Sequence, residues 1–110
     1  MAYFKRGKCY MMMHDYKRAL YDFSAAILNE TRAFNKQPIL PGRSEGGLAS
    51  FYMHGGMCNY YLGQYEEALA HYEIAISKNP DDDLLSKIFY NKGLANASLM
   101  RYDDAISDQL

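Results

Sequence analysis

Residues 65–69 read YEEAL, and the same pattern returns as YKRAL at residues 16–20 and as YDDAI at residues 102–106. A glycine stands twelve residues before the alanine of each copy, and these glycines are Gly7, Gly56 and Gly93. Two residues after each glycine comes a small side chain, in order Cys9, Cys58 and Ala95. Agreement at so many positions in register identifies three copies of an internal repeat.

Each repeat is predicted to fold as two short antiparallel helices. In the second repeat, Ala68, Tyr72 and Ile76 follow one another at four-residue intervals, which gives one apolar helical face. The small residues of the pattern let the two backbones come close, and the aromatic side chains fill the remaining space. The first helices are expected at residues 2–13, 49–61 and 86–98. The second helices are expected at residues 16–29, at residues 65–78 and from residue 102 onward.

The helices of a pair are expected to be separated by turn-forming residues, His14 and Asp15 in the first repeat and Gly63 and Gln64 in the second. Pro80 ends the second repeat, because proline cannot continue a helix and the residue before it avoids the helical region. The sequence therefore predicts an all-α chain of six helices with no β-strand.

The repeats are not evenly spaced along the chain. The alanines of the YxxA pattern, which we call the signature alanines, are 49 residues apart between Ala19 and Ala68 but 37 apart between Ala68 and Ala105. The first interval includes residues 34–48, which hold two prolines and three glycines and are predicted to be an inserted loop, either tolerated or functional. The expected organisation is a repeat at 1–33, the loop at 34–48, a repeat at 49–82 and a repeat at 83–110 that is truncated in its second helix. No polar capping repeat is visible, so we expect the chain to be part of a longer repeat protein.

Composition and charge exclude several classes of function. The 110 residues are 49% hydrophobic and 23% charged, which excludes intrinsic disorder. The net charge of −1 removes the basis for nucleic-acid binding. The charge is uneven, because residues 1–33 carry six basic and three acidic side chains whereas residues 49–110 carry four and nine. No apolar run approaches the roughly 18 residues of a membrane span, so no membrane insertion is expected.

No catalytic constellation, cofactor site or metal site is expected, and the chain is not predicted to be an enzyme. Cys9 and Cys58 hold the same repeat position as Ala95, so both are predicted to be small core residues. No two of the three histidines have the i, i+4 spacing of a metal pair; they are His14, His54 and His71. The acidic run at residues 81–83 lacks the ligand spacing of a calcium loop and is predicted to be a solvated helix start.

The second repeat resembles a tetratricopeptide repeat from end to end. The residues that carry this resemblance are Tyr52, Gly56, Leu62, Gly63, Tyr65, Ala68, Tyr72, Ala75 and Pro80. The first and third repeats resemble the family with weaker ends. Thr31 stands at the place of the proline, and Arg6 and Lys92 stand where a leucine is expected before the glycine. The resemblance implies a right-handed α-solenoid of antiparallel helix pairs that binds other proteins.

In this family, the first helix of each repeat lines a concave groove that receives a partner peptide or helix. Carried over to this sequence, the resemblance implies a groove formed by Phe4, Lys8, Met11, Met53, His54, Met57, Tyr60, Tyr61, Lys87, Tyr90, Asn91 and Leu94. This lining is apolar and rich in methionine, which suits an apolar or amphipathic partner segment. The alternative is that these side chains pack against neighbouring repeats or against the long loop.

One use of the family's fold is a carboxylate clamp for the acidic C-termini of chaperones. The matching positions here are Phe4, Lys8, His54, Lys87 and Asn91. Only Lys87 has the residue type that the clamp needs, so a chaperone-linked adaptor is disfavoured.

The predicted function is a non-catalytic scaffold that binds other proteins through its groove or its stacking ends. The alternative from a different class is a structural component of a large ciliary or cytoskeletal assembly. Two cysteines do not make a disulfide framework and the first residues do not form a signal peptide. The expected location is therefore intracellular and cytoplasmic, with the cilium or cytoskeleton as the more specific alternative.

Overall fold

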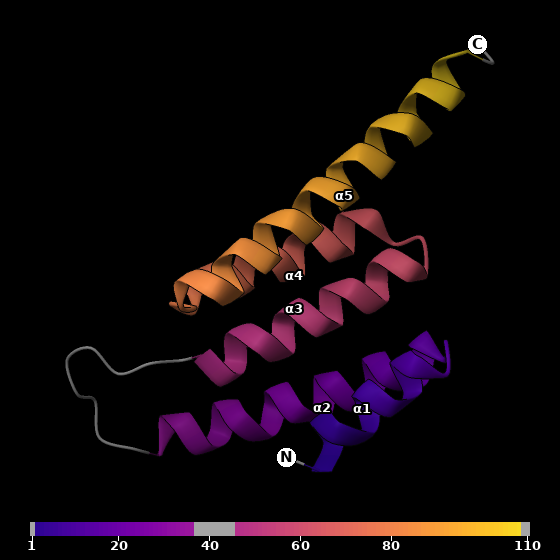
Figure 1. The fold of residues 1–110 in the computed structure, drawn as a ribbon. Coiled ribbons are helices and arrows are strands. Elements are labelled where there is room, and N and C mark those ends of the chain that lie inside the picture. Colours follow the sequence, from indigo (N-terminus) through magenta and orange to yellow (C-terminus); the bar gives the residue numbers. More distant parts are fainter. Residues whose placement is uncertain (1, 37–45, 109–110) are drawn as a thin grey trace.

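The computed structural model of the chain describes residues 2–36 and 46–108, which form five α-helices and, within these two ranges, no β-strand (Figure 1). The helices are α1 (Ala2–Met12), α2 (Tyr16–Asn35), α3 (Gly46–Tyr61), α4 (Tyr65–Ser77) and α5 (Asp82–Asp108). The predicted all-α class is therefore confirmed.

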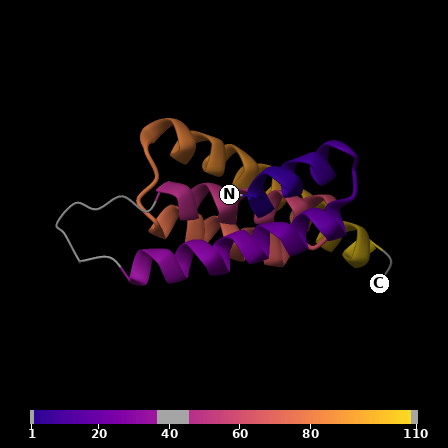
Figure 2. The same cartoon turned by 90° about the horizontal axis from the view of Figure 1, so that it is seen from below.

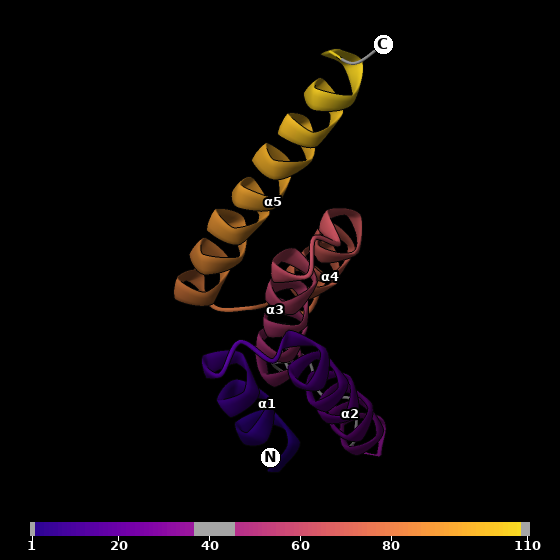
Figure 3. The same ribbon diagram turned by 90° about the vertical axis from the view of Figure 1, so that its right-hand side faces the viewer.

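The helices form an array in which each one packs against the next along the chain, from α1 with α2 to α4 with α5. Figure 3 shows α1 and α5 on one side of the array, α2 and α4 on the other, and α3 between them. The same division is visible in Figure 2, where the indigo and orange helices lie above the purple α2. The array is elongated, with extents of 55 × 30 × 21 Å. Contacts that run mainly between neighbours along the chain are those of a solenoid.

Close backbone approach holds the first two helix pairs together. A Cβ atom added to Gly56 of α3 would lie 2.5 Å from Cε1 of Tyr72 on α4. One added to Gly7 of α1 would lie 2.8 Å from Cε1 of Phe23 on α2. Both rings stand four residues after a signature alanine, so the repeat pattern produces the same contact twice. Only glycine leaves room for a buried ring at this distance.

The turns of the first two pairs share one backbone conformation. His14 has a φ of 61° and Gly63 a φ of 78°, so both lie in the left-handed region. Glycine enters this region freely, and histidine enters it more readily than most other side chains. The start of α5 is capped in the usual way, because the Asp81 carboxylate accepts a hydrogen bond from the Leu84 N–H at 2.8 Å.

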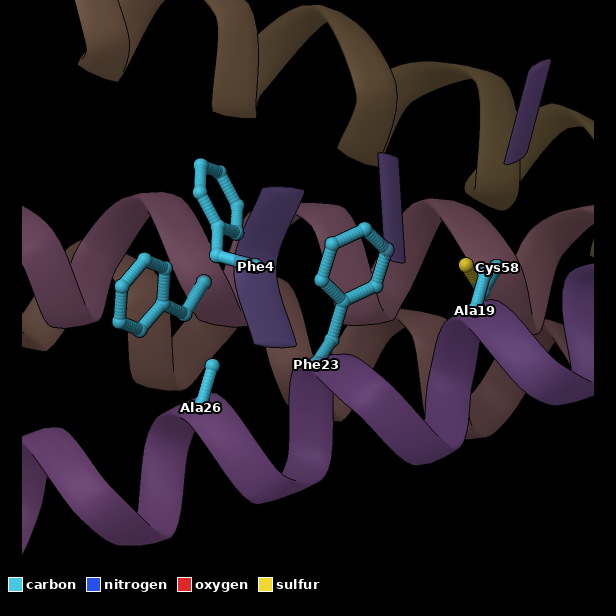
Figure 4. Packing of buried hydrophobic residues seen from close by; sticks show 6 residues of the cluster. Phe4, Ala19, Phe23, Ala26 and Cys58 are labelled. Atoms are coloured by element: carbon cyan, nitrogen blue, oxygen red, sulfur yellow. The ribbon is translucent and has the colours of Figure 1, made fainter. Parts of the chain in front are cut away.

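Two apolar clusters form the core, and α3 contributes to both. The first cluster contains Phe4, Ala19, Phe23, Ala26, Phe51 and Cys58, most of which are seen in Figure 4. The second cluster contains Met53, Ala68, Tyr72, Ala75, Ile88 and Ala95. The signature alanines Ala19 and Ala68 are fully buried, whereas the side chain of Ala105 lies outside the described part of the structure.

The third repeat does not form the predicted helix pair. α5 continues without a break from Asp82 to Asp108, so the separation into helices at 86–98 and from 102 onward is wrong. Met100 aligns with the left-handed turn residues His14 and Gly63. An ordinary side chain in the left-handed region costs about 1–2 kcal/mol, and methionine is a good helix former. The straight helix therefore follows from the lack of a turn-forming residue.

The inserted segment is also shorter than the predicted loop at 34–48. α2 extends to Asn35 and α3 begins at Gly46, so both flanks of the expected loop are helical. Leu48, which the prediction placed in the loop, is buried. The prolines of the segment lie at 37–45, outside the described residues.

Candidate partner-binding face

The twelve residues predicted to line a groove lie on α1, α3 and α5. α1 reaches α3 through Phe4, whose ring centroid lies 4.6 Å from that of Phe51 and 5.0 Å from that of His54. α3 reaches α5 through Tyr60, whose hydroxyl accepts a hydrogen bond from the Ser98 hydroxyl at 3.3 Å. The three helices therefore share one surface, which we call the α1/α3/α5 face.

Two of the predicted lining residues are buried. Phe4 is 9% exposed and belongs to the first core cluster, and Met53 is 6% exposed and belongs to the second. Each stands where its helix meets the neighbouring helices, as the contacts of Phe4 with Phe23 and Phe51 show. Both side chains support the face from beneath and offer a partner little surface, which corrects their assignment as lining residues.

The centre of the face holds one imidazole between two lysines. The Nδ1 N–H of His54 donates a hydrogen bond to the Ser50 carbonyl at 2.8 Å. Burial lowers the pKa of His54, and the positive charges of Lys8 and Lys87 lower it further, whereas the bond to Ser50 opposes the shift. The charges of Lys8 on α1 and Lys87 on α5 thus add to burial in favouring the neutral imidazole of His54.

Both lysines already have partners. The Lys8 ammonium lies 4.9 Å from the centroid of the Phe4 ring, in a cation–π contact. The Lys87 ammonium lies 3.3 Å from a carboxylate oxygen of Asp83, one turn earlier on α5. Asn91 donates its amide hydrogen to the Lys87 carbonyl at 3.0 Å. The polar groups of the face are thus engaged in contacts within the chain.

The accessible remainder of the face is largely apolar. Tyr61, Tyr90 and Leu94 are 54%, 70% and 38% exposed. Tyr90 and Leu94 stand one helical turn apart on α5, so their side chains are neighbours. Three further lining residues are half-buried, with one side against the core, and these are Met11, Met57 and Tyr60. The exposed part of α3 and α5 on this face is therefore aromatic and aliphatic.

The cysteines do not share one environment, although they share one repeat position. Cys58 is fully buried, and burial raises the pKa of its thiol to about 12. Cys9 is exposed, so its assignment as a core residue is wrong. This position faces the preceding helix pair, and no described helix packs on that side of α1.

Within residues 2–36 and 46–108, no group of three or more metal-ligating side chains gathers. None of the helices described is both long and apolar enough to cross a membrane. One cleft of about 420 Å³ is lined by Gly63, Gln64, Tyr65, Glu66, Glu67 and Leu99. A second, of about 230 Å³, is lined by Tyr3, Ala26, Asn29, Glu30, Ala33 and Phe51. Neither cleft contains a residue of the predicted groove.

Sequence reasoning missed the two ion pairs made by Arg6 and Lys92. Arg6 donates to both carboxylate oxygens of Asp22, at 2.8 and 2.7 Å, and Lys92 pairs with Glu73. Asp22 is 1% exposed, and its bonds with Arg6 lower the pKa of its carboxyl although burial acts in the opposite direction. A basic residue at a position where the family has leucine is the signal that could have predicted these pairs.

Comparison with known proteins agrees with this geometry. Residues 51–82 match the family model of the tetratricopeptide repeat. The matched segment holds most of α3 and all of α4, the pair joined by the Gly56–Tyr72 contact. No curated protein and no solved structure matches the chain. The resemblance seen in the second repeat is thereby confirmed for residues 51–82, the segment that forms most of α3 and all of α4.

Proposed function

We propose that the chain is a protein-interaction scaffold whose α1/α3/α5 face holds an apolar or amphipathic segment of a partner protein. The family match supports the general role, because tetratricopeptide repeats are protein-interaction modules. The observation that carries the choice of face is the exposed pair Tyr90 and Leu94 on α5, beside a lysine that already has a carboxylate partner.

Apolar contact is the main contribution that this face can make to binding. Covering a large apolar side chain contributes on the order of 1.5–3 kcal/mol before the costs of association. Met11 and Met57 add flexible thioether side chains, which adapt to partners of different shape. Charge favours the orientation of the partner rather than its affinity, since the first repeat is basic and the later part of the chain acidic.

The proposal includes a non-catalytic role. At the centre of the face, the Nδ1 N–H of His54 bonds to the Ser50 carbonyl of its own helix. The lysines beside it are held by Phe4 and Asp83. We further place the scaffold in the cytoplasm, which imaging of a fluorescently tagged chain tests directly.

The experiment compares two matched double variants in partner recovery. Tyr90→Glu with Leu94→Glu places two negative charges on the α1/α3/α5 face. Tyr21→Glu with Leu28→Glu makes the same two changes on α2, where both side chains are also exposed, at 72% and 51%. Each tagged protein is expressed in cells, its bound proteins are quantified by mass spectrometry, and its helical content is checked by circular dichroism.

We expect the α5 variant to lose at least 90% of the partner recovered with the unchanged chain, roughly the effect of 1.4 kcal/mol or more. The α2 variant should retain that partner. Full retention by a folded α5 variant would exclude this face as the binding site. Equal loss from both variants would show that any added negative charge suffices, which also contradicts the proposal.

A further inference from the structure

One side of α5 lacks the partner helix that the corresponding sides of α1 and α3 have. A Cβ atom at Gly93 would meet nothing within 4 Å, although the equivalent atoms at Gly7 and Gly56 would meet buried aromatic rings. Phe89 and Met100 are 52% and 66% exposed. The same side of the helix also includes an exposed asparagine and an exposed alanine, and the whole surface, which we call the Gly93 face, consists of Phe89, Gly93, Asn96, Ala97 and Met100.

The missing partner helix has a recognisable sequence. In the first two repeats, the glycine is covered by the helix that begins with YKRAL or YEEAL. The third copy of this pattern, YDDAI at residues 102–106, belongs to α5 itself. Residue 102 stands nine positions beyond Gly93, about 14 Å along a straight helix. In the straight form, this segment points away from the face that its sequence matches.

We propose that two copies of this chain associate through α5 in antiparallel fashion, so that residues 102–108 of each copy cover the Gly93 face of the other. The arrangement repeats between two chains the antiparallel packing that α1 with α2 and α3 with α4 form within one chain. It is symmetric and closed, as expected when identical elements are exchanged between protomers.

Charge favours the same arrangement. Residues 86–101 of α5 carry three basic and no acidic side chains, whereas residues 102–108 carry three acidic and no basic ones. Antiparallel pairing places each acidic segment along the basic segment of the other copy. Parallel pairing would place like charges together.

Met100 decides whether residues 102–108 pack on the second copy or fold back onto their own chain. Its counterparts His14 and Gly63 reverse the chain with a φ of 61° and 78°, a conformation that methionine disfavours. A glycine at this position would let residues 102–108 fold back onto their own Gly93. The first outcome is a dimer and the second a monomer, so the role of residue 100 as a hinge can be tested by sedimentation.

The experiment measures the mass of the 110-residue chain by analytical ultracentrifugation at concentrations from 1 to about 100 μM, a range that includes typical dissociation constants of modest dimers. We expect the unchanged chain to reach the mass of a dimer. Gly93→Arg should give a folded monomer, since its side chain enters open space in the single chain but the interface in the dimer. Leu94→Arg adds the same charge at the next position, outside the Gly93 face, and should leave the dimer intact.

The hinge variants give an independent test. Met100→Gly should convert the dimer to a monomer with the same helical content to within about a turn, and Met100→Ala, which keeps a good helix former, should remain a dimer. An unchanged chain that is monomeric throughout the range overturns the proposal. A dimer that survives Gly93→Arg, or one that survives Met100→Gly, also overturns it, because either result places the interface elsewhere.

Discussion

Gly55 and Gly56 are neighbours on α3, but only the surroundings of Gly55 leave room for a methyl group. A Cβ atom at Gly56 would lie 2.5 Å from Cε1 of the buried Tyr72, whereas one at Gly55 would lie 3.6 Å from the nearest atom of His71. We therefore expect Gly56→Ala to lower the free energy of unfolding by about 1–3 kcal/mol through overpacking. Gly55→Ala should be neutral or raise it by up to about 1 kcal/mol, since alanine is the better helix former. Urea unfolding followed by circular dichroism measures both, and equal effects would contradict the close approach.

Asp22 predicts a dependence of stability on pH. Its bonds with Arg6 lower the pKa of its carboxyl in the folded chain. The contribution of the charged pair is therefore complete above the pKa of an unfolded aspartate, about 3.9, and is lost as the pH falls through the lower folded value. We expect Asp22→Asn to cost about 1–2 kcal/mol at pH 7 and distinctly less at about pH 3, in thermal melts.

A surface pair provides the control for that measurement. Asp15 lies 3.4 Å from Arg18 on the exposed start of α2, where an ion pair is worth little. Asp15→Asn keeps a good helix cap and should change stability by less than about 0.5 kcal/mol at either pH. If Asp22→Asn shows the same small effect, the buried carboxylate does not stabilise the fold.

At the residue scale, the sequence predicts positions that recur and misses those that depend on a neighbour. The contacts of Gly7 and Gly56 follow from the register of glycine and signature alanine. Cys9 and Cys58 cannot be told apart in this way, because burial of this position depends on whether another helix pair precedes it. Arg6 is visible only as a departure from the repeat pattern, and its partner Asp22 becomes apparent only when α1 and α2 are placed side by side.

At the scale of elements, the first two helix pairs could be predicted because their turns contain residues that enter the left-handed region. The error at α5 has the same cause. The repeat pattern continues through residues 102–106 and suggests a hairpin, but Met100 gives the backbone no favourable way to turn. The repeat pattern thus predicts which two helix surfaces can pack together. The residue at the turn decides whether the two helices pack within one chain.

The turn between α3 and α4 allows this reasoning to be tested. Gly63→Met places the residue type of the third repeat at a φ of 78°, and we expect it to lower the free energy of unfolding by about 1–2 kcal/mol. Gly63→Asn should cost less, because asparagine tolerates the left-handed region. Chemical denaturation of both variants gives the comparison. Equal costs would show that side-chain size rather than backbone conformation governs the turn.

On the scale of the whole molecule, α3 links the two halves of the array. It supplies Phe51 and Cys58 to the first core cluster and Met53 to the second. α3 also carries Met57, which packs against the second cluster, and Tyr61, whose ring stacks on that of Tyr16 of α2 at 4.7 Å. The helix that holds the array together therefore also carries the centre of the proposed binding face, so its core positions are unsuitable for testing function. Tyr90 and Leu94, which are exposed on α5, separate binding from folding more cleanly.

The charges of the same face make acidic peptides with a free C-terminal carboxylate poor partners. Lys8 is held over the ring of Phe4 and Lys87 is paired with Asp83. Burial and both lysine charges lower the pKa of His54, which favours its neutral form. A carboxylate would have to displace these contacts before it could bind either lysine. We therefore expect an acidic chaperone-tail peptide to show no binding at low-micromolar concentration by titration calorimetry.

Asp83→Asn is the matched variant for this last measurement, because it removes the carboxylate that occupies Lys87. It should bind the acidic peptide more tightly than the unchanged chain by up to about fivefold, the effect of roughly one surface ion pair. The gain should disappear at high salt, since exposed charges are screened. Low-micromolar binding by the unchanged chain would show that the lysines are available after all. The face would then select its partner by charge, and the apolar pair on α5 would have a secondary role.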